Sequence, residues 1–79
     1  MINERVFDII ASNLNVPAET LTTETDLVGD LDADSIDTTN ILRSIKGQLG
    51  VDIKIEEALL LETIGDVIKL INKKTHHNH

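Results

Sequence analysis

Aliphatic residues recur at helical spacing near both ends of this 79-residue chain, and this pattern limits the folds that it can adopt. Side chains three or four positions apart lie on the same face of an α-helix. One such stripe lies early in the chain and another late, and they predict helices over residues 3–14 and 64–74. The first stripe consists of Ile2, Val6, Ile9, Ile10 and Leu14, and the second of Ile64, Val67, Ile68 and Ile71.

A third helix is predicted between these two, over residues 35–49. Asp34 is a favourable N-cap residue, and Asp37, three positions later, can complete a capping box with it. Gly50 follows the last apolar position and is a common helix stop. We expect the buried face of this helix to contain Ile36, Ile41, Leu42, Ile45 and Leu49.

The segment that follows is ambiguous. Val51, Ile53 and Ile55 alternate with polar residues as in a β-strand, but a lone strand would have no partner in this chain. The sequence "EEALLL" instead favours a short helix over residues 56–61.

The composition supports packed helices, because the chain contains no cysteine and only one aromatic residue, Phe7. A core of Ile, Leu, Val and Ala must therefore form without disulfides or thiolate metal sites. We expect an all-α fold, a small bundle of three main helices plus one short helix, with a long loop over residues 15–34. Residues 1–74 would form one domain, and residues 75–79 a disordered tail or an artificial remnant of cloning.

The net charge of −7, from 14 acidic and 7 basic residues, argues against binding to nucleic acid. Such binding needs clustered Lys and Arg, and the absence of Trp and Tyr also removes most base-stacking side chains. No apolar run approaches the roughly 20 residues that span a bilayer, so we expect no membrane segment. The first residues lack a signal-peptide pattern, which makes a cytoplasmic location the default expectation.

Residues 30–37 read "DLDADSID", which places four aspartates around Ser35. Three of these aspartates have the spacing of the first ligands of an EF-hand calcium loop. That loop needs glycine at its sixth position and glutamate at its twelfth, whereas this chain has Ser35 and Ile41 there. We therefore expect no metal site, apart from weak binding of divalent ions by the clustered carboxylates.

A catalytic serine is also unsupported by the sequence. Such a serine needs a nearby base and oxyanion donors, but the three histidines, His76, His77 and His79, lie in the final four residues. No G-x-S-x-G turn surrounds Ser35. We therefore expect that the protein is not an enzyme, and we assign no ligand role to the tail histidines.

A third interpretation is that Ser35 carries a covalent group. At the first position of a helix, free backbone N–H groups and the helix dipole favour an attached phosphate. The alternative is that Asp34 and Ser35 only cap the helix, and the local pattern leaves both interpretations open.

The motif "DLDADSID" closely resembles the D-L-G-A-D-S-L-D motif of acyl carrier proteins, and the likeness extends over about residues 3–72. The segment "ERVFDIIASNLNV" looks like the family's first helix, and "TIGDV" looks like the start of its last helix. The resemblance implies that Ser35 carries a 4′-phosphopantetheine arm, which a separate phosphopantetheinyl transferase adds from coenzyme A with magnesium. Acyl groups would be held as thioesters on this arm and passed between acyl-transferring or synthase enzymes, in fatty-acid or specialised lipid or polyketide biosynthesis.

The resemblance also implies a monomer with a surface that partner enzymes recognise. The chain departs from its family where Asp32 replaces the glycine of the motif, and where Arg43 and Lys46 lie in a stretch that is strongly acidic in typical fatty-acid carriers. Because docking depends on complementary charge, we expect a specialised carrier that generic fatty-acid synthase enzymes recognise poorly. The expected recognition residues are Asp30, Asp34, Ile36, Asp37, Asn40, Arg43, Lys46, Ile53 and Ala58.

Two alternatives are kept beside this interpretation. The first is an aminoacyl or peptidyl carrier of a dedicated pathway, although residues 32–35 read "DADS" rather than the glycine-rich "GGHS"-like core of the peptidyl type. The second is an acidic helical adaptor protein in which Ser35 is never modified.

Overall fold

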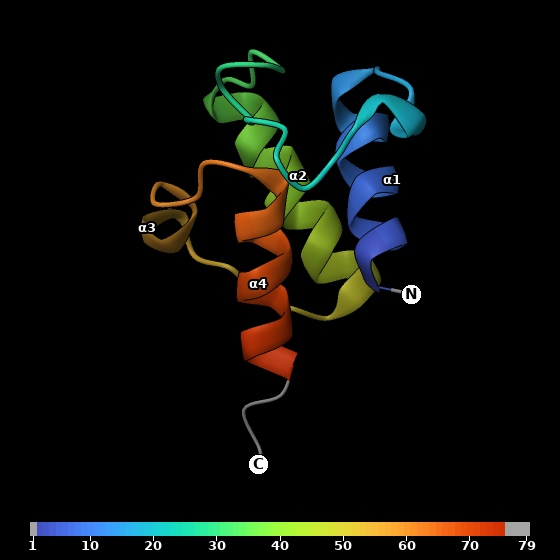
Figure 1. Cartoon of the computed structure of the whole chain (residues 1–79). Helices are drawn as coiled ribbons and strands as arrows, with labels where there is room; N and C mark the ends of the chain where they lie inside the picture. Colours follow the sequence, from blue (N-terminus) through green and yellow to red (C-terminus); the bar gives the residue numbers. More distant parts are fainter. Residues whose placement is uncertain (1, 76–79) are drawn as a thin grey trace.

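The chain folds into a bundle of helices, and the computed structural model describes residues 2–75 of it (Figure 1). The part of the chain that the structure describes contains no β-strand, so the predicted all-α fold is confirmed. Its elements are three long helices, one short helix and a 3₁₀ turn, namely α1 (Ile2–Leu14), η1 (Ala18–Thr20), α2 (Ser35–Leu49), α3 (Ile55–Ala58) and α4 (Ile64–Thr75).

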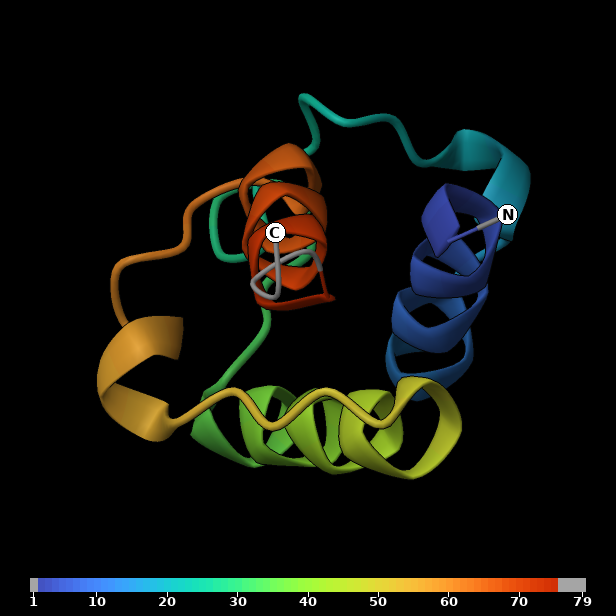
Figure 2. The same cartoon turned by 90° about the horizontal axis from the view of Figure 1, so that it is seen from below.

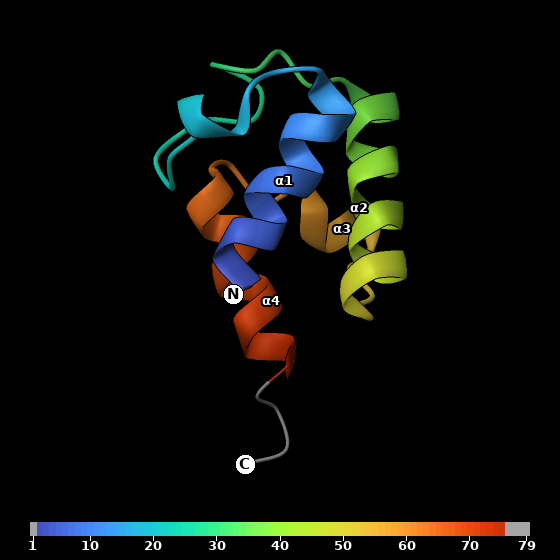
Figure 3. The ribbon, with the colours of Figure 1, turned by 90° about the vertical axis from the view of Figure 1, so that its right-hand side faces the viewer.

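The three long helices surround a common centre, and α3 lies to one side. Figure 1 shows α1 running upward and α2 and α4 running downward. Seen from below, α3 lies beyond α2 and α4 on the side away from α1 (Figure 2). The side view shows the beginning of α2, and the long loop before it, at one end of the bundle (Figure 3). The loop therefore crosses the end of the bundle at which α2 begins.

The core consists of the aliphatic stripes. All seven predicted positions from Val6 to Ile10 in α1 and from Ile64 to Ile71 in α4 are buried, and α2 adds Ile41 and Ile45. Ile36 is an exception, because its side chain is 69% exposed and its predicted place on the buried face is wrong. It lies nine residues before Ile45, which is about two and a half helical turns and therefore the opposite side of α2.

The short helix α3 ends earlier than the sequence predicts. It stops at Ala58, and the N–H groups of Leu60 and Leu61 bond to carbonyls three residues back, at 3.2 and 3.0 Å. This spacing is that of a 3₁₀ turn, which tightens the end of the helix. Before α3, Val51 and Ile53 are both buried although they form no strand.

Backbone hydrogen bonds join the long loop to the start of α4. The N–H of Leu27 donates to the carbonyl of Glu62 at 2.9 Å, and the N–H of Gly65 donates to the carbonyl of Thr23 at 2.8 Å. A Cβ atom at Gly65 would lie 2.9 Å from the Thr23 carbonyl oxygen, so this close approach requires glycine. The loop is thus fixed to the bundle by its backbone, despite its length.

The boundaries of α2 agree with the sequence prediction. Asp34 and Asp37 form the expected capping box at its start, and Gly50 ends it in a left-handed conformation with φ of 69°. A glycine at this position avoids the steric cost that a side chain would add.

The last helix continues through Thr75, a residue that the sequence analysis assigned to the tail. The rest of the predicted tail, residues 76–79 with its histidines, lies outside the described residues. No helix within residues 2–75 combines the length and the apolar character needed to cross a membrane.

Candidate functional site

Ser35 is the first residue of α2, and its side chain is exposed to solvent. Its backbone carbonyl accepts a hydrogen bond from the Thr39 hydroxyl at 2.9 Å. No residue in the described part of the chain forms a hydrogen bond with the Ser35 hydroxyl itself. The hydroxyl is therefore accessible at a helix start, where backbone N–H groups and the helix dipole favour a phosphate.

A tight turn at Asp26 sets the course of the chain toward α2. One oxygen of the Asp26 carboxylate accepts hydrogen bonds from the backbone N–H groups of Val28, at 3.0 Å, and Gly29, at 2.8 Å. Its backbone carbonyl also accepts a bond from the N–H of Asp30 at 3.0 Å. Bonds to an ionised acceptor are stronger than neutral ones, so this side chain organises the turn.

Three of the four aspartates in the motif hold the backbone in place. The Asp30 carboxylate accepts from the N–H of Asp26 at 2.8 Å. The Asp34 carboxylate accepts from the N–H of Asp37 at 2.8 Å, and the Asp37 carboxylate accepts from the N–H of Asp34 at 3.2 Å. Asp30 and Asp34 are exposed and Asp37 is half-buried. Asp32 instead adopts φ of 59°, a left-handed conformation that aspartate tolerates better than most residues. The carboxylates thus fix the start of α2 as well as surrounding it with negative charge.

An apolar cavity of about 140 Å³ lies between the long loop, α2 and α3. Its lining includes Ala33 and Thr38, which flank the serine in the sequence, and the buried side chains of Ile45 and Val67. An apolar cavity of roughly 150 Å³ can hold a molecule the size of benzene. The volume therefore admits a hydrocarbon of about six carbon atoms without any movement of the protein.

A larger and more open groove, of about 640 Å³, lies at the opposite end of the bundle. It is formed where α2 and α4 end, by residues that include Leu49, Val51, Leu70 and Lys73. The 15 residues of α2 rise by about 22 Å, so this groove is remote from the serine. The smaller cavity is therefore the nearer of the two to the start of α2.

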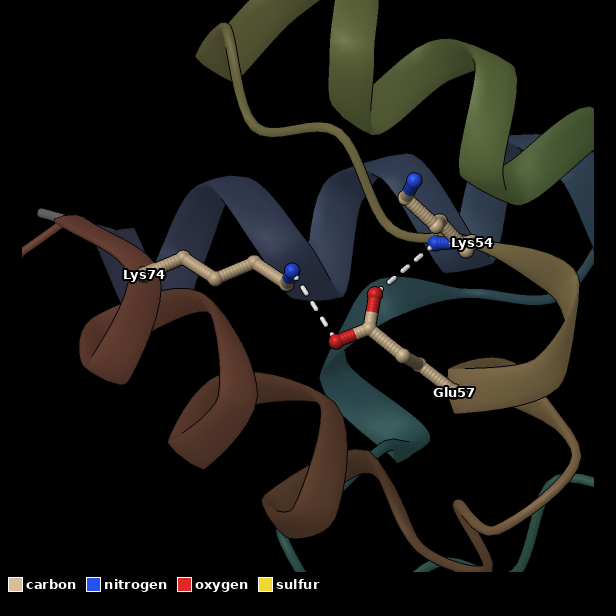
Figure 4. A network of polar contacts seen from close by, with 3 residues as sticks. All are labelled: Lys54, Glu57 and Lys74. Carbon is tan, nitrogen blue, oxygen red and sulfur yellow. Dashed lines mark hydrogen bonds and ion pairs between the residues drawn. The ribbon is translucent and has the colours of Figure 1, made fainter.

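The α3 wall of the small cavity is anchored by Glu57. Its carboxylate accepts a hydrogen bond from the backbone N–H of Lys54 at 3.0 Å and lies 3.0 Å from the Lys74 ammonium (Figure 4). The bond from the Lys54 N–H, followed by the interaction with Lys74, lowers the pKa of Glu57 below its ordinary value of 4.5. One side chain therefore connects α3 to the segment before it and to α4.

Asp66 stabilises the start of α4 in a similar way. Its carboxylate accepts hydrogen bonds from the backbone N–H groups of Glu62, at 3.0 Å, and Thr63, at 3.1 Å. These bonds lower the pKa of Asp66 below its ordinary value of 3.8.

Within residues 2–75, no three or more His, Cys, Asp or Glu side chains are grouped so that they could hold a metal ion.

Residues 4–71 match the model of a protein family described as a phosphopantetheine attachment site. The chain is 36% identical over 73 residues to the acyl carrier protein of Rickettsia massiliae (strain Mtu5), and the aligned region covers 92% of this chain and 85% of that protein. It is 34% identical to the acyl carrier protein of Rickettsia canadensis (strain McKiel), and this alignment also covers 92% of this chain and 85% of that protein. This chain belongs to the acyl carrier protein family.

The fold of the chain also resembles that of a solved acyl carrier protein. A solved structure of an acyl carrier protein from Enterococcus faecalis superimposes with a TM-score of 0.76, at 26% identity over 92% of both chains. The predicted acyl carrier role, the absence of enzymatic activity and the phosphopantetheine cofactor are therefore confirmed. Acyl carrier proteins interact with synthases and transferases. An accessible hydroxyl at a helix start, with an apolar cavity beside it, fits a phosphate-linked arm that carries an apolar group.

Four of the five recognition residues predicted on α2 lie on the exposed side of this helix, whereas Asp37 is half-buried. Ile36, Asn40 and Arg43 are spaced by four and three residues, so they share one face, and Lys46 follows one turn later. All four side chains are exposed. The surface of α2 therefore changes from acidic at its start to basic in its second half.

Two predicted recognition residues lie in the core instead, which corrects the sequence interpretation. Ile53 is 5% exposed and Ala58 is 9% exposed, so neither offers a surface to another protein in this structure. The exposed large apolar residues that the sequence analysis did not assign to any site are Val28, Ile55, Leu59 and Leu60. The sequence contains an indication of this exposure. Three successive leucines, at residues 59–61, cannot all face the core from the predicted helix over residues 56–61.

Proposed function

We propose that Ser35 is the residue that carries the 4′-phosphopantetheine arm in this acyl carrier protein. The observation that supports this most directly is its exposed hydroxyl at the first position of α2, within the sequence "DADS". When attached, the arm supplies a thiol on which acyl groups are held as thioesters. The chain's own residues position the attachment point and shelter the cargo.

Attachment requires a separate transferase, because no side chain within residues 2–75 forms a hydrogen bond with the Ser35 hydroxyl through which it could take the proton. The neighbouring Asp34 and Asp37 carboxylates are occupied with backbone N–H groups, and negative charge opposes deprotonation of the Ser35 hydroxyl. In the proposed step, the Ser35 oxygen forms a bond to the phosphorus next to pantetheine in coenzyme A. The pyrophosphate bond breaks, adenosine 3′,5′-bisphosphate leaves, and the hydroxyl proton passes to a base of the transferase.

We propose that the small apolar cavity beside α2 shelters the acyl chain. It borders Ala33 and Thr38, so a group attached to Ser35 has a short path into it. Its present volume of about 140 Å³ admits only a short chain. A longer chain needs α3 to move outward, and an ion pair between Glu57 of this four-residue helix and Lys74 joins it to α4.

The test is to incubate the protein with coenzyme A, magnesium and a broad-specificity phosphopantetheinyl transferase, and to measure its intact mass. The wild-type protein should gain the mass of one phosphopantetheine, and Ser35→Ala should gain none. Ser12→Ala, which removes another exposed serine, is the matched control and should be modified like the wild type. A wild-type protein that stays unmodified, or a Ser35→Ala variant that gains the same mass, would contradict the proposal.

We also propose that this carrier is a monomer that serves dedicated enzymes rather than generic fatty-acid synthase enzymes. Its docking surface would combine the acidic start of α2 with the basic side chains of Arg43 and Lys46 on the same helix. Complementary charge governs both the rate of encounter and the choice of partner. A partner suited to an entirely acidic helix would meet repulsion in the second half of α2.

The charge argument predicts the effect of three glutamates on α2, introduced by Asn40→Glu, Arg43→Glu and Lys46→Glu. Elongation of the loaded triple variant by ordinary fatty-acid enzymes should rise about tenfold in kcat/KM, because the repulsion is removed. The control carries Asn3→Glu, Lys69→Glu and Lys73→Glu, which change the net charge equally at exposed sites on α1 and α4. If the unaltered protein is already elongated as efficiently as a typical fatty-acid carrier, the proposal of specialised partners is wrong.

A further inference from the structure

The short helix α3 separates the small apolar cavity from the large groove at the opposite end of the bundle. Ala58 lines the small cavity, whereas the residue before it, Glu57, lines the large groove. Val67 of α4 and several residues of α2 form other parts of the small cavity's lining. The volume of the small cavity therefore depends on how far α3 lies from α2 and α4.

The hydrogen bonds within the α3 segment are local. The backbone N–H groups of residues 58–61 all donate to carbonyls of residues 54–58, at 3.0 to 3.2 Å. The bond from the Lys54 N–H to the Glu57 carboxylate, at 3.0 Å, also lies within this segment. These bonds hold the segment together as a unit, but they do not fix its distance from the long helices.

An ion pair crosses from α3 to α4. The Glu57 carboxylate lies 3.0 Å from the Lys74 ammonium, and Figure 4 shows the two side chains reaching toward each other from the two helices. Their side chains are 35% and 29% exposed, so solvent weakens the attraction without removing it. Movement of α3 away from α4 lengthens the distance between the two charges and reduces this attraction. The pair therefore opposes enlargement of the small cavity.

We propose that the ion pair between Glu57 and Lys74 makes the carrier shelter short acyl chains in preference to long ones. The inference rests on the proposed attachment at Ser35 and the proposed shelter in the small cavity. A chain of about six carbon atoms fits the present volume of about 140 Å³, so its entry leaves the pair intact. A chain of twice that length requires α3 to move outward and weakens the pair. The pair thus disfavours only the longer chain.

The expected selection is graded. Ion pairs with this degree of exposure change an equilibrium constant by a factor of roughly 1.5 to 5. A long chain can still enter the protein, but it spends more of its time in solvent than it would without the pair. The pair therefore biases the cargo toward short chains and does not exclude long ones.

The experiment loads Ser35 with hexanoyl- or dodecanoyl-phosphopantetheine from the matching acyl coenzyme A, using a broad-specificity transferase. Each acyl chain carries carbon-13 at its terminal methyl group, and NMR measures the ratio of sheltered to solvent-exposed methyl groups. Lys74→Gln breaks the pair and leaves Glu57 able to accept from the Lys54 N–H. We expect this variant to raise the dodecanoyl ratio about threefold and to leave the hexanoyl ratio unchanged.

Further variants separate the pair from other causes. Lys73→Gln removes the same charge from the exposed neighbour, which also lines the large groove, and Lys74→Arg keeps the charge. Both should match the wild type. Glu57→Gln should act like Lys74→Gln, and the double variant should have no larger effect than either, because one pair can be lost only once. Circular dichroism and urea unfolding check that all the proteins are folded.

Each other outcome overturns the inference or one of the proposals beneath it. An unchanged dodecanoyl ratio would show that the pair does not restrain α3, and an equal rise for both chain lengths would show a general loosening of the protein. An equal effect of Lys73→Gln would assign the change to net charge, and additive effects of the two single substitutions would show that the two residues act separately. Methyl groups that stay in solvent at both lengths in every protein contradict the proposed shelter instead. A wild-type protein that is never loaded contradicts the proposed attachment at Ser35.

Discussion

The two walls of the apolar cavity beside Ser35 are held in different ways. The loop wall is fixed by carboxylates that accept backbone N–H groups, at Asp26 and Asp30, and it is joined to α4 by backbone hydrogen bonds. The α3 wall is a helix of four residues that places Ala58 in the core and is joined to Lys54 and Lys74 through Glu57, and two exposed leucines follow it. A carrier benefits from one fixed wall and one wall that can move. The loop wall keeps the attachment point in place, and the α3 wall lets the cargo enter and leave.

The loop wall should be the more sensitive of the two to mutation. Asp26→Ala removes an acceptor that serves the N–H groups of Val28 and Gly29, and we expect it to lower the free energy of unfolding by about 2 kcal/mol. Urea unfolding at pH 7 measures this. Asp32→Asn is the control, since it removes one charge from the same loop and keeps the left-handed backbone accessible, and its effect should stay within about 0.5 kcal/mol. Equal losses in the two variants would mean that charge, and not the turn, stabilises the loop.

The cap of α2 should have an intermediate effect. Asp34→Ala removes the side chain that accepts from the Asp37 N–H, and such a loss typically costs about 1 kcal/mol. For a domain of this size the melting temperature should fall by roughly 4–8 °C. Asp34→Ser retains a capping oxygen and should recover most of the loss. An unchanged melting temperature in Asp34→Ala would contradict the structural role assigned to this aspartate.

The anchor of α3 should have the smallest effect, and it should depend on pH. Because the pKa of Glu57 is lowered in the folded protein, its contribution to stability is complete above its ordinary value of 4.5 and is lost as the pH falls through the lowered pKa. Glu57→Gln should therefore reduce the melting temperature slightly at pH 7, and this deficit should shrink as the pH falls below 4.5. Glu56→Gln removes the same charge from an exposed neighbour and serves as the control. A Glu57→Gln deficit that persists unchanged at pH 3 would argue against the ionised anchor.

The parts of the fold that depend on local sequence could be predicted. The bounds of α2 follow from Asp34, Asp37 and Gly50, since a capping box and a left-handed glycine act within one turn of the chain. The stripes of α1 and α4 were also clear, because their periodicity is sustained. The resemblance to acyl carrier proteins identified Ser35 as the attachment residue, and family membership supports the carrier role.

The parts that depend on packing could not be predicted. Ile53 and Ala58 lie in segments without a sustained period, and only the arrangement of α3 against the long helices decides that both are buried. The sequence predicts Asp30 as a recognition residue, but its carboxylate also builds a turn together with Asp26, to which the sequence analysis assigned no role. That role depends on the backbone course of a loop without periodicity, which the sequence does not reveal.

The most direct test of the carrier assignment is the mass of the protein purified from its natural cell. Intact-mass measurement followed by fragmentation should find phosphopantetheine on the peptide that contains Ser35. Treatment with hydroxylamine should release an acyl group from its thiol and identify the cargo. A natural protein that is unmodified under all growth conditions, or that carries the group on another residue, would contradict the account.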